Sequence, residues 1–222
     1  MNQKETEPGL SFERVVFFSD AVFAIVITLL VLEIKVPHLE GHTERDVGRG
    51  LLHLLPKFLG FVMSFFVVGS MWIEHHRIFR LIDSYDIGLL FRNLLLLLSV
   101  SFIPFPTALY SEYSWSRTAF ILYAASFGVV ALMKLWVWRY AASRPALLSA
   151  AADAQTIRRV SRRSWAVPAA CAVAIALSFI SVYLAPLGFP FIPLFARLLD
   201  PAPPGVAADL SGDVAGDETP AA

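Results

Sequence analysis

The chain has 222 residues, of which 57% are hydrophobic and 16% are charged, and its 18 basic residues balance its 18 acidic ones. Separate apolar segments of about twenty residues recur along it, which indicates an all-α, polytopic membrane protein. A net charge of zero gives no indication of a nucleic-acid partner, and the single cysteine, Cys171, excludes an internal disulfide.

The first apolar segment falls within residues 12–36, and Pro37 is expected to stop its helix. From Val15 to Leu32, only Ser19, Asp20 and Thr28 interrupt the apolar run, which is long enough to cross a membrane as a helix. A carboxylate inside such a run is costly unless a partner or water compensates its charge. Asp20 therefore has a functional or a structural polar role.

One narrow face of this helix, drawn at about 100° per residue, carries three aliphatic side chains: Ile25, Leu29 and Leu32. Thr28 lies at the edge of this face, and Arg14 and Phe18 lie on it nearer the N-terminal end. Asp20 points more than a third of a turn away from the aliphatic face. Such a face can form stacked rings around an axis in an oligomer, although the pattern by itself favours ordinary helix packing.

A charged loop is expected at residues 38–50, before a second apolar segment at 51–73. Trp72 suits a membrane interface. The adjacent His75 and His76 point about 100° apart and no spaced set of His or Glu ligands accompanies them, so we predict no metal site. Instead, we expect Trp72 and one of the two histidines to hydrogen-bond the Ser19/Asp20 region; the sequence leaves open which one.

Four further segments complete a prediction of six membrane helices. Pro104 and Pro106 are expected to kink or end the third, and prolines make the sixth short or broken. A basic, alanine-rich connection at 141–163 precedes the fifth and is expected to anchor the chain on the cytoplasmic side. The segments are residues 87–109, 117–140, 165–184 and 186–199.

The basic residues also predict the orientation. Six spans put thirteen of the eighteen Lys and Arg residues on the side of the two termini and five on the other, so both termini should be cytoplasmic. We divide the chain into an N-terminal arm at 1–10, a transmembrane domain at 11–199, and a Pro/Gly/Ala-rich, acidic tail at 200–222 that should be disordered.

The first apolar segment resembles that of a known family. Arg14, three further residues, Phe18-Ser19-Asp20 and the following FAIVITLLVLEI up to Ile34 are similar to the first helix of the transmembrane protein 175 family of potassium channels. The resemblance implies a homotetramer in a prokaryotic cell membrane, surrounded by lipid, with potassium as the permeant ion and no cofactor. Four first helices would line the pore. Ile25, Leu29 and Leu32 would form constricting rings, with Thr28 as a polar contributor.

The resemblance also implies a polar network that holds the first helices in register. Its candidate members are Arg14, Phe18, Ser19, Asp20, Trp72 and His75 or His76. The network residues would thus support the pore and would not bind the ion.

Three functions follow from these patterns. The first is a potassium-selective channel, because a ring of aliphatic side chains can gate by excluding water. The alternative is a proton-coupled secondary transporter that uses Asp20 with His75 or His76 as a relay. The third is a membrane scaffold without transport. The sequence has no nucleotide-binding loop and no nucleophile constellation, so we do not expect an enzyme.

Overall fold

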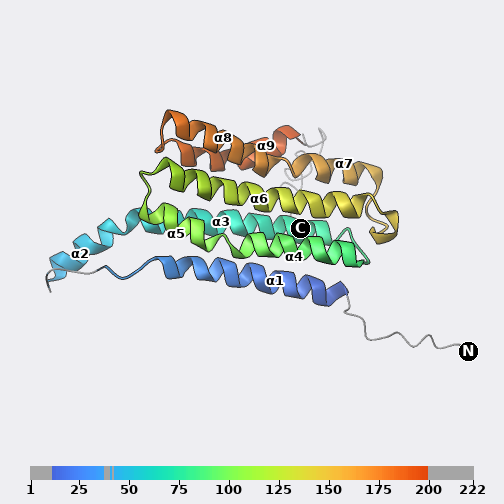
Figure 1. Ribbon diagram of the computed structural model, residues 1–222, viewed down its shortest axis with the longest axis horizontal. Coiled ribbons are helices and arrows are strands. Elements are labelled where there is room, and N and C mark those ends of the chain that lie inside the picture. The colour runs from blue at the N-terminus through green and yellow to red at the C-terminus, as the bar shows by residue number, and fades with distance from the viewer. Residues whose placement is uncertain (1–11, 38–40, 42, 200–222) are drawn as a thin grey trace, which may run out of the picture.

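The computed structural model describes residues 12–37, 41 and 43–199, and the regular secondary structure of this part of the chain is helical, apart from one isolated bridge between Ile82 and Leu148 (Figure 1). The predicted arm at 1–10 and tail at 200–222 lie outside the described residues. The α-helices are α1 (Phe12–Leu29), α2 (Glu44–His53), α3 (Leu55–Phe79), α4 (Ile87–Ser101), α5 (Pro104–Glu112), α6 (Arg117–Ala142), α7 (Ala154–Arg163), α8 (Ala166–Ile180) and α9 (Ile192–Leu199). Short 3₁₀ helices are η1 (Leu30–Glu33), η2 (Pro145–Leu147) and η3 (Ala185–Phe191).

Five helical stretches of the described chain are long and apolar enough to cross a membrane: Phe12–Glu33, Leu55–Phe79, Ile87–Glu112, Arg117–Ala142 and Ala154–Ile180. A sixth, shorter segment consists of η3 and α9, which pack against α8 (Figure 1). The chain is therefore a multi-pass membrane protein, and its last segment is short and broken as predicted. Pro186 and Pro190 account for this, because proline cannot donate a helical hydrogen bond.

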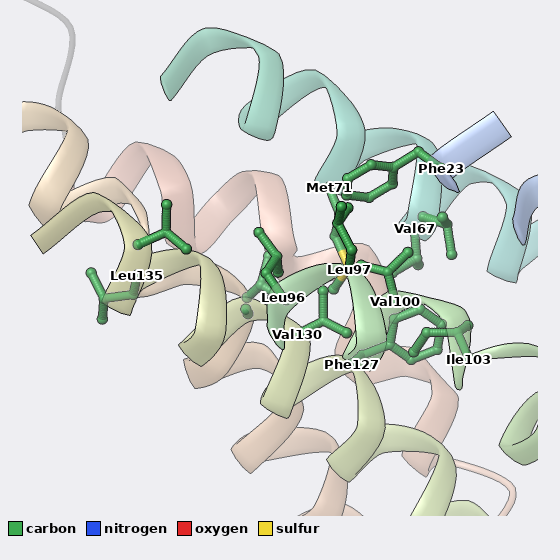
Figure 2. Close-up of a cluster of buried hydrophobic side chains, with 14 of the residues drawn as sticks. Phe23, Val67, Met71, Leu96, Leu97, Val100, Ile103, Phe127, Val130 and Leu135 are labelled. Atoms are coloured by element: carbon green, nitrogen blue, oxygen red, sulfur yellow. The ribbon is translucent and has the colours of Figure 1, made fainter. Parts of the chain in front are cut away.

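Helix α6 lies at the centre of the bundle and packs against α8, α4 and α5 (Figure 1). Its side chains meet those of α3 and α4 in a continuous apolar cluster, which Phe23 of α1 also joins (Figure 2). Phe127 and Trp138 of α6 are fully buried. The membrane domain is thus organised around α6, with α1 on its outer side.

The third span is interrupted where the prolines predicted a kink. Helix α4 ends at Ser101, and α5 starts at Pro104, the position at which a helix accepts proline because its missing N–H would have no partner there. A short turn at Tyr113 to Ser116 then leads to α6, whose first turn is capped by the Ser116 hydroxyl accepting from the Ala119 N–H. The connection makes the third and fourth spans neighbours.

The predicted loop at 38–50 is wrong because it contains a helix, and the predicted connection at 141–163 also ends in one. Helix α2 occupies most of the expected loop at 38–50, and α7 occupies the end of the expected connection at 141–163. Both helices are polar, so neither shows the long apolar period of a span, but both have caps. Thr43 and Asp46 form a capping box at α2, and the Asp153 carboxylate accepts from the Thr156 N–H at α7.

The first helix also ends earlier than its proline predicted. Regular α-helix stops at Leu29, and η1 continues the span to Glu33, well before Pro37. The Thr28 hydroxyl donates back to the carbonyl oxygen of Ile25 at 2.8 Å. Such a bond to a carbonyl one turn earlier weakens the regular helical pattern and bends helices, which accounts for the change of helix type at this point.

Candidate functional site

Helix α1 has one face inside the bundle and one face outside it. The buried face carries Val15, Ser19, Phe23 and Val26, and the helix packs against α3 and α4. The opposite face carries the predicted aliphatic stripe: Ile25 is 57% exposed, Leu29 is 40% exposed and Leu32 is 67% exposed. A single copy of the chain therefore leaves the whole stripe free to meet other copies or lipid.

The stripe crosses the change from α-helix to 3₁₀ helix. Ile25 and Leu29 belong to α1, whereas Leu32 belongs to η1. Thr28 lies between them and is exposed, and its hydroxyl hydrogen is directed to the carbonyl oxygens of Ala24 and Ile25. A hydroxyl that donates to the backbone keeps its oxygen lone pairs available, so Thr28 can present an oxygen to a cation beside the stripe.

Asp20 is held by α3. The Trp72 indole Nε1 donates to Asp20 Oδ1 at 2.8 Å, and Asp20 is only half-buried. A hydrogen bond to a charged acceptor is stronger than one between neutral groups. Asp20 faces α3 and not the exposed stripe, so its position is that of a link between two helices.

Ser19 is connected to α4 and, through it, to α3. The Asn93 Nδ2 group donates to Ser19 Oγ at 2.9 Å, and Asn93 Oδ1 lies 3.1 Å from His75 Nε2. Ser19 itself donates to the carbonyl oxygen of Val15. All three side chains are buried. Because the amide oxygen of Asn93 can only accept, the His75 ring carries its proton on Nε2.

The buried His75 ring is enclosed by two aromatic rings. It stacks on Phe79 at 4.2 Å between ring centroids and lies 5.4 Å from Phe23. His75 Nδ1 is buried without a hydrogen-bond partner among the described residues. The histidine that the sequence left undecided is therefore His75, and it reaches Ser19 through Asn93 instead of directly.

The remaining predicted network residues lie elsewhere. His76 is exposed and its ring lies 6.0 Å from that of Trp72. Arg14 and Phe18 are exposed on the same side of α1 as the aliphatic stripe, so the fold does not bring them to Asn93 or His75. Asn93 itself was missed by the sequence reasoning, although an amide within the run LLFRNLLLLL is a signal of a buried polar contact.

No group of three His, Cys, Asp or Glu side chains within residues 12–37, 41 and 43–199 is arranged to hold a metal ion. Helix α1 instead has two different faces. Its inner face is hydrogen-bonded to two neighbouring helices, and its exposed outer face carries aliphatic side chains. Chemically, the outer face offers a water-excluding surface with one hydroxyl oxygen at its edge.

Comparison with known proteins identifies the same region. A family model described as the endosomal/lysosomal potassium channel TMEM175 matches residues 14–104. This range contains α3, α4 and nearly all of α1, with the Trp72–Asp20 bond and the bonds of Asn93 to Ser19 and His75. A potassium channel of Chamaesiphon minutus is 42% identical over 174 residues, which cover 77% of this chain and 86% of that protein.

Solved structures and more distant relatives agree with this match. A crystal structure of a lysosomal potassium-selective channel TMEM175 homologue from the same organism superposes with a TM-score of 0.74 at 38% identity, and covers 85% of this chain and 98% of that one. The endosomal/lysosomal proton channel TMEM175 of Homo sapiens is 25% identical over 180 residues. These cover 80% of this chain but only 35% of the human protein.

Proposed function

The chain belongs to the TMEM175 family, and on that premise we propose that it is a potassium-selective channel whose pore is lined by α1 from several copies. Its closely matching relative from Chamaesiphon minutus is named a potassium channel. The observation that carries the proposal is the exposed aliphatic stripe of α1, opposite a face that is fixed to α3 and α4.

A pore of this kind requires an oligomer. Each chain supplies one α1 with one exposed stripe, so the wall of a pore needs copies of that helix around an axis. We propose a homotetramer with α1 innermost, in which Ile25, Leu29 and Leu32 form successive rings. A narrow aliphatic ring is a barrier because water leaves it, and it conducts when it widens.

The hydrogen bonds of Ser19 and Asp20 act on the same helix at one level. Asp20 is bonded to α3, and the adjacent Ser19 is bonded to α4. Two contacts in different directions oppose rotation of α1 about its own axis. We propose that Ser19, Asp20, Trp72, Asn93 and His75 thereby keep the stripe directed at the pore, while Thr28 supplies an oxygen ligand to the permeant ion.

Two observations argue for a channel over a proton-coupled transporter. The relatives of this chain are named channels. A relay between Asp20 and a histidine also needs the two groups to exchange a proton, whereas His75 is bonded to Asn93 and Asp20 to Trp72. Members of the family are described both as potassium channels and as proton channels. Proton flux therefore has to be measured as well as potassium flux.

We propose that both termini are cytoplasmic in a prokaryotic cell membrane. The start of α1, the end of α3 and the arginine-rich α7 lie at one end of the bundle (Figure 1). Basic residues are retained on the cytoplasmic side of membrane helices, so this basic end is the cytoplasmic one.

The test is ion flux into liposomes that contain the purified protein. Potassium and sodium fluxes are compared with the membrane voltage clamped by a proton ionophore, and proton flux is measured separately without that ionophore. We expect potassium flux well above sodium flux. Ile25→Asn and Leu29→Asn should raise the flux at least about tenfold and reduce the potassium preference, because a polar ring holds water in the constriction.

A matched control is Leu98→Asn, which makes the same change at a leucine of α4 that is 68% exposed. It should leave the flux unchanged. If the wild type, both α1 variants and the control have equal fluxes, α1 does not line the pore. Saturable transport that depends on a proton gradient would instead establish a transporter.

A further inference from the structure

Two of the membrane spans are interrupted at the same depth. Helix α1 runs in the same direction as α4 (Figure 1), and the bond between Asn93 and Ser19 places these two residues at one level. Eleven residues further along each span lie Leu30, the first residue of η1, and Pro104, the first residue of α5. This offset corresponds to about 16 Å of helix in both spans. The two interruptions therefore lie beside each other, and η1 packs against α5.

The joint between α4 and α5 has a definite chemical cause. Pro104 and Pro106 carry no N–H group. The carbonyl oxygens of Val100 and Phe102 therefore lack a donor four residues ahead, and each accepts from the residue three ahead, at N···O distances of 3.0 and 3.2 Å. Bonds across three residues have poorer geometry than those of an α-helix. The backbone of this joint is thus easier to deform than the two helices that it connects.

The joint between α1 and η1 is similar. The Thr28 hydroxyl donates to the carbonyl oxygen of Ile25, and the chain continues after Leu29 as a 3₁₀ helix. A 3₁₀ stretch within a longer helix often marks a hinge. Helices α3 and α6 are regular along their whole length, so they provide a fixed frame around the two joints.

The two sides of the joint in α1 are attached differently. On the inner side, Ser19 and Asp20 hydrogen-bond to neighbouring helices. Phe12 and Phe23 lie against rings of α3, at 6.0 and 5.4 Å between ring centroids. On the outer side, η1 packs against α3 and α5, and Leu30 is its buried residue. Among the described residues, no side-chain hydrogen bond or ion pair joins η1 to another helix, so apolar contacts hold it.

Helix α5 is attached in a way that lets it follow η1. Its Tyr110 ring lies 5.3 and 5.1 Å from two aromatic rings of α6, and packed side chains of this kind permit small sliding movements. Its Glu112 carboxylate pairs with Lys57 of α3, but Glu112 is exposed, and exposed ion pairs are weak. Ile103, at the joint, is fully buried, so protein and not lipid surrounds the irregular backbone.

We propose that the two joints form one gating hinge, which rests on the proposed channel function. Opening moves η1 and carries Leu32 away from the pore axis, while α5 shifts with η1 by bending at its joint with α4. Ile25 lies on the anchored side of the hinge and keeps its position. The Leu32 ring is then the moving gate, and the Ile25 ring is a constriction of constant width. Leu30 and the two prolines act as positioning residues for the gate.

The test is hydrogen–deuterium exchange of the full-length protein in detergent, followed by mass spectrometry of its peptides. The double variant Pro104→Ala/Pro106→Ala restores two N–H donors and stiffens the joint. Amide exchange in α5 should slow at least about fivefold, which is the effect of one additional helical hydrogen bond. Because η1 packs against α5, exchange in η1 should slow as well, although the two segments are far apart in the sequence.

A second substitution separates the two segments. Leu30→Ala, added to the double proline variant, removes the buried side chain of η1, so η1 should again exchange at least as fast as in the wild type while α5 stays slow. Val26→Ala, at a residue that is 2% exposed on the anchored side, is the matched control and should leave η1 slow. Pro186→Ala removes a proline from η3, which packs against α8 and α9, and should change neither segment.

Potassium flux into liposomes shows whether the hinge acts on the gate. The double proline variant should lower the flux by about the same factor as it slows exchange in η1, since both depend on the population of the moved state. The ratio of potassium to sodium flux should not change, because Ile25 lies on the anchored side. Pro104→Ala alone restores one bond and should act in the same direction with a smaller effect, which keeps the test decisive if the double variant does not fold.

Three outcomes overturn the proposal. The first is slower exchange in α5 without any change in η1, which would show that the joints are independent. The second is equal slowing by Pro186→Ala, which would indicate a general effect on stability. The third is slower exchange in both segments at unchanged potassium flux, which would show a hinge that is not a gate. A wild type without potassium flux would instead refute the channel function, and the exchange rates would still establish or refute the coupling of the joints.

Discussion

Helices α1 and α6 are both long, apolar membrane spans, but the chain surrounds them very differently. In the first span, Phe12–Glu33, the most apolar of the five, 28% of the apolar stretch is buried in the bundle, whereas in α6 the share is 56%. Apolar character therefore does not measure how deeply a membrane helix is buried, because lipid is as apolar as a protein core.

The two helices also use polar groups differently. Helix α6 buries Lys134 against Glu74 and Tyr123 against Ser64, within a nearly closed shell of neighbours. Helix α1 directs Ser19 and Asp20 towards its neighbours in the bundle and leaves the aliphatic stripe, with Thr28 beside it, outside. The difference indicates that α6 holds the bundle together, whereas α1 is held by it and presents a surface.

The largest expected effect on stability is in the α6 core. Phe127→Ala removes a fully buried ring that contacts Tyr123 and Phe189, and should lower the free energy of unfolding by about 3–5 kcal/mol. Thermal unfolding in detergent measures it. Phe91→Ala, at a ring that is 57% exposed on α4, is the control and should cost less than about 1 kcal/mol. Similar losses in both variants would contradict the central role of α6.

The buried ion pair of α6 comes next. Lys134→Met leaves the Glu74 carboxylate without its partner and should destabilise the protein by about 3 kcal/mol, because an uncompensated charge is then partly buried. Adding Glu74→Gln should restore most of the loss. The comparison is made by unfolding of both variants, and a double variant that is no more stable than Lys134→Met would show that the pair is not coupled.

A smaller effect is expected where α1 is attached. Asn93→Leu removes the link between Ser19 and His75 and should cost about 1–3 kcal/mol, since both partners remain buried. It should also change potassium flux by altering the rotation of α1. Ser99→Ala, which removes only a bond to the carbonyl oxygen of Leu95 in the same helix, is the control. If Asn93→Leu has the same potassium flux as the wild type, this hydrogen-bond network does not influence the pore.

The smallest effect on stability belongs to the outer face. Thr28→Val keeps the shape of the side chain and removes a bond within the exposed part of α1, so the unfolding free energy should change by less than about 0.5 kcal/mol. If Thr28 supplies an oxygen to the ion, the ratio of potassium to sodium flux nevertheless falls. If neither the ratio of potassium to sodium flux nor the stability changes, Thr28 does not bind the ion and its hydroxyl bonds only to the backbone.

Local patterns were sufficient for most of the membrane architecture. The apolar runs, the prolines at 104 and 106, and the motif from Arg14 to Ile34 predicted the spans, the break between α4 and α5, and the family. They failed for α2, a polar helix within the predicted loop, which begins at the capping box of Thr43 and Asp46. They also left open that α7, capped by Asp153, is helical.

By itself, the sequence determined that this chain crosses a membrane several times and that its first helix has one aliphatic face with a carboxylate on another side, because hydrophobic length and helical period are properties of consecutive residues. Only the tertiary structure decided which face of α1 is exposed, that His75 and not His76 belongs to the network, and that Asn93 joins Ser19 to it. It alone also brought α7 beside the end of α3. These contacts join residues far apart in the chain, and their geometry follows from how the helices pack.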